Sequence, residues 1–175
     1  SKLDFVCPFE MNPESQKELL LMKRVNLKSL DKLLHCNSSI DFPNVEHAKF
    51  DFIEFPSIDP IAAFGFFAKF THLTSVELFY FDKKSFEFIL KIFQQNKIKN
   101  LIVSIGYGFN NIAQLFQLID CCPDLISFSL TKCCEIDEEC YLVGMKERNG
   151  SGGSWKNLKR LSFSSFSYNF ICTIL

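Results

Sequence analysis

The sequence predicts an α/β solenoid, in which parallel strands line the concave face and helices cover the convex face. Three observations lead to this fold class. An apolar triplet with strand spacing recurs five times, and stretches with the helical 3.6-residue period follow two of the triplets at a nearly constant offset. Hydrophobic residues make up 47% of the 175 residues, which is enough for the repeated units to share one continuous core.

The apolar triplet consists of one residue, a second three positions later and a third two positions after that. Its second and third members point to the same side of an extended strand. The five triplets are Val45-Ala48-Phe50, Leu73-Val76-Leu78, Ile98-Leu101-Val103, Leu125-Phe128-Leu130 and Leu158-Leu161-Phe163. Their starts are 28, 25, 27 and 33 residues apart. The last spacing is longer because it contains a glycine- and serine-rich insertion at residues 149–154, and without it the spacing is 27.

Amphipathic helices are predicted between the triplets. Apolar residues with i, i+3, i+4, i+7 spacing are Phe86, Ile89, Leu90 and Phe93, followed by Ile112, Leu115, Phe116 and Ile119. The two stretches begin 13 and 14 residues after the triplet starts Leu73 and Ile98, and Asp82 and Asn110 are placed to cap them. By the same plan, we expect residues 59–70 and 136–148 to supply the helices of the first and fourth units.

The first 44 residues follow the pattern less closely. Val25 and Leu27 fit a strand, so an earlier repeat is expected from Met22, and Leu3 and Phe5 fit the second half of a still earlier strand. The alternative is one long helix over residues 13–36, because the segment opens with Asn-Pro-Glu, a typical helix start. The whole chain is expected to be a single domain over residues 1–175. It is also expected to be a fragment of a longer protein, because it begins without Met and stops in an apolar run.

The composition argues against several partners. There are 19 basic and 20 acidic residues and a net charge of −1, so no basic surface for nucleic acid or anionic membrane is expected. No apolar run approaches the ~18 residues of a membrane span. The eight cysteines form no CxxC or CxxH pair, so we expect reduced thiols, no metal and no cofactor, in a cytoplasmic or nuclear protein.

Catalytic chemistry is not indicated either. The three histidines are His35, His47 and His72, and none has a nucleophile and an orienting group at a convergent spacing. His47 is four residues from Asp51, a pair that could be part of a catalytic site but is more simply a solvated polar strand. Gly106-Tyr107-Gly108 lacks the third glycine and the lysine of a phosphate loop. The chain is therefore predicted not to be an enzyme.

One segment carries a family resemblance. Residues 122–139, CPDLISFSLTKCCEIDEE, resemble the cysteine-containing leucine-rich repeat, whose pattern is CPxLxxLxLxxC followed by an Ile and an Asp that open the helix. The spacings of the triplets, apart from the one with the insertion, fall in the leucine-rich-repeat range of about 20 to 29 residues. Phe81, Gly106 and Phe166 occupy or border the place of the Cys or Asn in other units, where the chain departs from the pattern.

Such repeats occur in F-box proteins, the substrate receptors of ubiquitin ligases, and in ribonuclease-inhibitor-like horseshoes. The resemblance implies a non-enzymatic scaffold that binds another protein on its concave face, as the substrate-recognition part of such a ligase. Residues 1–34 lack the Leu-Pro opening and the Trp of an F-box, so ligase components would bind through a region that precedes residue 1. Two alternatives stay open: a fragment of an extracellular or innate-immune receptor, and a regulator of another enzyme.

The predicted binding face follows from strand alternation. Residues between the inward members of each triplet point outward and align into columns when the units stack. These partner-binding candidates are His47, Lys49, Asp51, Ser75, Glu77, Phe79, Asn100, Ile102, Ser104, Ser127, Ser129, Thr131, Arg160, Ser162 and Ser164. Phe79 and Ile102 are expected to be exposed and to form an apolar centre, ringed by polar groups, as in protein interfaces.

Overall fold

The computed structural model of the chain describes residues 3–5, 21, 23–27, 42–52, 65–81, 86–105, 112–132 and 156–167. Within this part of the chain, one sheet contains seven strands in sequence order, and every neighbouring pair is parallel. The strands are β1 (Leu3–Phe5), β2 (Arg24–Leu27), β3 (His47–Asp51), β4 (Ser75–Phe81), β5 (Asn100–Ile105), β6 (Ser127–Lys132) and β7 (Arg160–Ser164).

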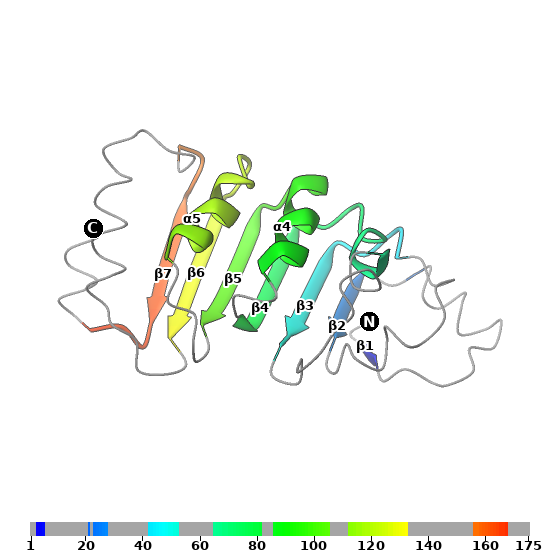
Figure 1. Cartoon of the computed structure of the whole chain (residues 1–175), viewed down its shortest axis with the longest axis horizontal. Helices are drawn as coiled ribbons and strands as arrows, with labels where there is room; N and C mark the ends of the chain where they lie inside the picture. Colours follow the sequence, from blue (N-terminus) through cyan, green and yellow to red (C-terminus); the bar gives the residue numbers. More distant parts are fainter. Residues whose placement is uncertain are drawn as a thin grey trace.

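In the described part of the chain, helices α4 (Phe86–Gln95) and α5 (Ile112–Asp120) lie on one face of this sheet (Figure 1). Helix α4 follows β4, and helix α5 follows β5, both at the places predicted from the apolar spacing. Parallel neighbours need a crossover connection, and in these two units the helix supplies it. The α/β class predicted from the sequence is therefore confirmed.

The predicted triplets stack in register across the sheet. Two columns of inward side chains are Ala48, Val76, Leu101, Phe128 and Leu161, then Phe50, Leu78, Val103, Leu130 and Phe163. The register continues toward the N-terminus, where Val25 pairs with Ala48 and Leu3 pairs with Val25. The two early strands are thus present, and the alternative of a long helix is wrong for Arg24–Leu27. Pairing with β3 buries Val25 to 4% exposure.

The core lies between the sheet and the helices. Helix α4 buries Phe86, Ile89, Ile92 and Phe93 and exposes Glu87 and the two glutamines that end it. The four triplet starts from Val45 to Leu125 are at most 2% exposed. In the helix predicted over residues 59–70, the described residues are helical at positions 65–67 and form a turn at 68 and 69.

A backbone hydrogen-bond pattern marks each unit at the same place. The carbonyl of Glu46 accepts hydrogen bonds from the amides of Thr74 at 2.9 Å and Ser75 at 3.0 Å. The carbonyls that accept in the same way, each from two consecutive amides of the next unit, are those of Lys23, Thr74, Lys99 and Ile126. These positions are one residue after the triplet starts, so the backbone repeats with the period of the apolar pattern.

Asn96, directly after α4, ties two units together. Its side chain is 7% exposed. The Oδ1 atom accepts a hydrogen bond from the amide of Leu73 at 2.7 Å, and Nδ2 donates to the carbonyls of Phe70 at 2.7 Å and Ile92 at 2.8 Å. A buried amide with three partners satisfies backbone groups that would otherwise be orphaned at a helix end and a turn.

Several predicted features lie outside the described residues. They are the helix over residues 136–148, the insertion at 149–154, the caps Asp82 and Asn110, the turn at 106–108, His35, and six of the eight cysteines. In the part of the chain that is described, no helix is long and apolar enough to cross a membrane.

Candidate functional site

The fifteen predicted outward residues lie together on the sheet face opposite α4 and α5, which we call the outward face. The register arranges them in three rows across β3 to β7. The first row is His47, Ser75, Asn100, Ser127 and Arg160; the second is Lys49, Glu77, Ile102, Ser129 and Ser162; the third is Asp51, Phe79, Ser104, Thr131 and Ser164.

Two residues of β2 extend this face and were missed from the sequence. Arg24 pairs with His47 and Asn26 pairs with Lys49, so they continue the first and second rows. The signal was available, because Arg24 and Asn26 alternate with the inward residues Val25 and Leu27. The same residues also fit the long helix over residues 13–36, so the sequence pattern alone does not place them on this face.

Exposure varies along the outward face. The outward side chains of β7 are exposed, and most of those on β3 to β6 are half-buried. Ser104 is buried at 3% exposure, so the prediction that it is available on the surface is wrong. It stands in its row between Phe79 and Thr131, two larger side chains that leave it little contact with solvent.

Phe79 is also less available than expected. Its ring is half-buried, and the Nζ atom of Lys49 lies 3.8 Å from the ring centroid. This is a cation–π contact between neighbouring strands, worth about 0.5–1 kcal/mol at an exposed site. Ile102 is half-buried between Glu77 and Ser129 in the second row. The predicted apolar centre is therefore a half-buried pair, one member of which is covered by a charged group.

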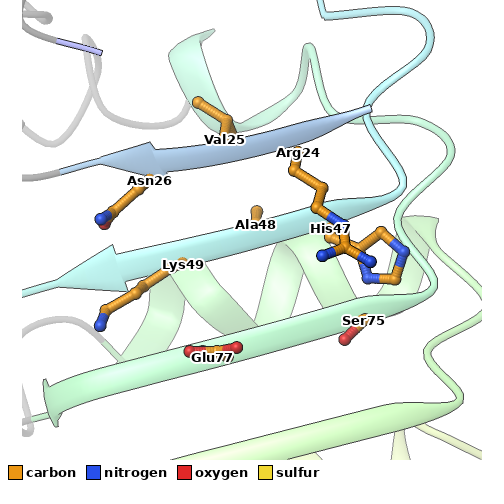
Figure 2. A pocket seen from close by; sticks show the side chains of 8 residues that line it. All are labelled: Arg24, Val25, Asn26, His47, Ala48, Lys49, Ser75 and Glu77. Atoms are coloured by element: carbon orange, nitrogen blue, oxygen red, sulfur yellow. The ribbon is translucent and has the colours of Figure 1, made fainter. Parts of the chain in front are cut away.

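A pocket of about 330 Å³ opens at the N-terminal end of the outward face. It is lined by Arg24, Val25, Asn26, His47, Ala48, Lys49, Ser75 and Glu77, which come from β2, β3 and β4. Figure 2 shows Arg24, His47 and Ser75 toward one end of the three strands, and Asn26, Lys49 and Glu77 toward the other. The pocket thus combines two rows of polar side chains.

Among the described residues, the charged groups that line the pocket form no ion pair with one another. Lys49 and Glu77 are register partners, yet the ion pair found among the described residues is a different one, between Lys23 and Glu46 at 3.1 Å. That pair sits just before β2 and β3, and its side chains are 71% and 43% exposed. The described residues of the lining carry a formal charge of +1 when His47 is neutral, from Arg24 and Lys49 against Glu77.

The histidines are not arranged with catalytic partners in the described residues. His47 and Asp51 stand two rows apart, about 13 Å along the strand at 3.3 Å per residue. His72 is exposed at the turn before β4, and its Nδ1 atom is 2.9 Å from the hydroxyl of Thr71. Among the described side chains, no group of three His, Cys, Asp or Glu could hold a metal ion.

Cys121 and Cys122 are free thiols at the end of α5. Burial raises the pKa of Cys122 to about 12, with a smaller contribution from Cys121, and burial also raises the pKa of Cys121. The Sγ atom of Cys122 donates a hydrogen bond to the carbonyl of Leu118 at 3.3 Å. A buried, protonated thiol of this kind is a packing residue, because the thiolate is the form that reacts.

Comparison of the sequence with known protein families finds no family model that matches, and no curated protein resembles it significantly.

Proposed function

We propose that the chain is a leucine-rich-repeat solenoid that binds another protein on its outward face and has no catalytic activity of its own. The observation that carries the proposal is the outward face itself: five adjacent parallel strands present three aligned rows of side chains. Stacked repeats create such extended surfaces, and the repeat proteins known to use them bind macromolecules.

The repeat assignment is supported by the unit that carries the resemblance. Leu125, Phe128 and Leu130 of the segment that resembles the cysteine-containing repeat are 2%, 1% and 0% exposed, and Cys122 is fully buried. Four of the positions that define the pattern are thus buried in the core, whereas Pro123 is exposed and Cys133 lies outside the described residues. The shared carbonyl acceptors from Lys23 to Ile126 give the backbone the same period.

The side-chain chemistry of the outward face suits reversible binding of a partner. Hydroxyl and amide groups dominate β5 to β7, and such groups are satisfied by water when no partner is bound. We further propose a cytoplasmic or nuclear location and a substrate-recognition role in an F-box-type ubiquitin ligase. The free thiols of Cys121 and Cys122 support the first, and the resemblance of residues 122–139 supports the second.

A site-specific photo-crosslinking experiment tests the binding face. A benzophenone amino acid replaces Ile102 on the outward face or, as the matched control, Gln94 on the exposed side of α4. In cells, the Ile102 probe should capture a defined partner that the Gln94 probe does not capture. Capture of that partner from Gln94 alone would assign binding to the helical side and overturn the proposal.

A pair of alanine variants then separates binding from folding. Phe79→Ala should change the free energy of unfolding little. If Phe79 is a hot spot, the variant should bind the captured partner more weakly, by about 1–2 kcal/mol. Leu101→Ala, an inward residue that is 1% exposed, should instead lower the free energy of unfolding by about 2–5 kcal/mol. Thermal unfolding and partner titration measure the two effects. Unchanged affinity for Phe79→Ala would remove this residue from the binding surface.

A further inference from the structure

We propose that the pocket between β2, β3 and β4 binds the carboxylate of an aspartate or glutamate side chain of the partner. The inference rests on the proposed function and names the chemistry that the partner presents at the N-terminal end of the outward face. It is carried by the charges that line the pocket and by their arrangement on three neighbouring strands.

The donors of the pocket come from adjacent strands. Arg24 and His47 are register partners in the first row, and Asn26 and Lys49 are partners in the second. Neighbouring strands are about 4.8 Å apart, so donors on β2 and β3 can reach the same small anion. A guanidinium presents a planar fork that matches a carboxylate, and an ammonium adds a point charge. Each row therefore offers two donors to an anion in the pocket, Arg24 with His47 and Asn26 with Lys49 (Figure 2).

Lys49 is partly preorganised for this role. Its ammonium lies 3.8 Å from the ring centroid of Phe79, on the same face of the sheet as Arg24. Contact with the ring limits the freedom of a long side chain, so less conformational entropy is lost when an anion binds. Among the described residues, Arg24 makes no ion pair that a ligand would have to break.

Glu77 selects the charge of the ligand. With Arg24 and Lys49 against Glu77, the described residues that line the pocket carry a formal charge of +1 when His47 is neutral. A carboxylate, with charge −1, neutralises this lining. A phosphate group carries about −1.5 to −2 at neutral pH, so it would leave excess negative charge next to the Glu77 carboxylate. The pocket is accordingly matched to a carboxylate and opposed to a phosphorylated side chain.

The size of the pocket agrees with a single side chain. Its volume of about 330 Å³ is at the small end of the range for ligand sites, about 300–1,000 Å³. A single acidic side chain needs no more room than this. The rest of the partner would lie along the rows of β5 to β7, so the pocket would fix the end of the contact.

Three blocked peptides test the inference on the full chain. They share glycine and serine flanks and differ in one central residue, which is glutamate, glutamine or phosphoserine. Backbone amide shifts measured by NMR report binding at residues of β2, β3 and β4. The glutamate peptide should shift these signals and should bind about tenfold more tightly than the glutamine peptide, which lacks the charge. The phosphoserine peptide should bind no more tightly than the glutamate peptide.

Variants assign the effect to the pocket. The double variant Arg24→Gln, Lys49→Gln should reduce glutamate-peptide affinity about fivefold or more, whereas Gln94→Ala on the exposed side of α4 should leave it unchanged. Glu77→Gln should improve phosphoserine binding relative to glutamate binding, a change of preference that loss of structure would not produce. Circular dichroism confirms that each variant is folded.

The outcomes distinguish this inference from the proposed function. If no peptide shifts the amides of β2 to β4, or if phosphoserine binds most tightly to the unaltered chain, the carboxylate site is wrong. The proposal that the outward face binds a partner would remain supported if the Ile102 probe captured a partner in cells. If instead the glutamate peptide binds in the pocket but Ile102 captures nothing, the carboxylate site stands and the broader binding face does not.

Discussion

Strands β3 and β7 have the same alternation of inward and outward side chains, but their inward side chains are buried to different extents. Ala48 and Phe50 of β3 are 3% and 0% exposed, whereas Leu161 and Phe163 of β7, in the same two columns, are half-buried. β3 has a strand on each side, and β7 is the last strand of the described sheet. Alternation therefore sets the direction of a side chain, and its place in the stack sets how much apolar surface leaves water.

Aromatic packing strengthens the contrast. Around β3, the ring of Phe42 stacks on that of Phe70 with centroids 4.7 Å apart, and Phe50 meets Phe67 and Phe70 edge-on at 5.4 Å and 5.8 Å. Near β7, Phe163 meets Phe166 at 5.9 Å, and both are half-buried. Ring pairs of this geometry contribute about 0.5–1.5 kcal/mol beyond the burial of area. We expect the early part of the sheet to hold more of the stability.

The largest effect should come from removing a ring in the second inward column. Phe50→Ala should lower the free energy of unfolding by about 3–5 kcal/mol, because it leaves a cavity among three other rings. Phe163→Ala, the same change in the same column, should cost about 1–2 kcal/mol because its ring is half-buried. Urea denaturation of both variants measures the difference. Equal losses would mean that β7 is packed as firmly as β3.

A smaller version of this comparison uses leucines in the first inward column. Leu101→Ala should cost about 2–5 kcal/mol, since Leu101 is 1% exposed. Leu161→Ala should cost about 1 kcal/mol, since its side chain already contacts water in the folded state. Thermal unfolding of the two variants under one buffer condition provides the test. A larger loss for Leu161 than for Leu101 would reverse the proposed gradient along the sheet.

The asparagines that reach back to the preceding unit provide a polar comparison. Asn96→Ala should cost about 1–3 kcal/mol, because it leaves the buried amide of Leu73 without its acceptor. Asn157 donates one hydrogen bond at 3.0 Å to the carbonyl of Pro123 and is exposed, so Asn157→Ala should cost about 0.5–1 kcal/mol. Urea denaturation distinguishes them. Identical urea midpoints for the two variants would show that the hydrogen bonds of Asn96 stabilise the fold no more than that of Asn157.

The smallest expected effect concerns the two thiols at the end of α5. The pKa of Cys122 is raised to about 12 by burial, so at pH 8 iodoacetamide should alkylate it at least about tenfold more slowly than the less buried Cys121. Peptide mass mapping over time measures both rates. At pH 8 the Cys122 thiol is mostly protonated in both the folded and the unfolded chain, so its ionisation should not change the free energy of unfolding. Above pH 9.0, the ordinary thiol value, stability should fall because the unfolded chain loses the proton first. Equal alkylation rates would place Cys122 at the surface.

The strands and helices followed from local pattern. The two-residue period of Phe50 and its equivalents predicted which side chains point inward, and the 3.6-residue period predicted α4 and α5. Val25 and Leu27 also fitted a strand, and the structure decided between that strand and the long helix. Local propensity left both open, because the deciding energy comes from pairing with β3, which lies more than twenty residues away.

Sequence patterns predicted the α/β class, the spacing of the units and fifteen residues that point outward, but they did not assign Arg24 and Asn26 to that face. Three features depend on the tertiary structure: the position of Lys49 over Phe79, the burial of Ser104, and the pocket lined by residues of three strands. The hydrogen bonds of Asn96 also depend on the tertiary structure, because its partners Leu73 and Phe70 are more than twenty residues away in the sequence. The period of apolar residues along one strand predicts which side of that strand a side chain points to. Its neighbours on other strands depend on the register, which is set by packing summed over the whole sheet.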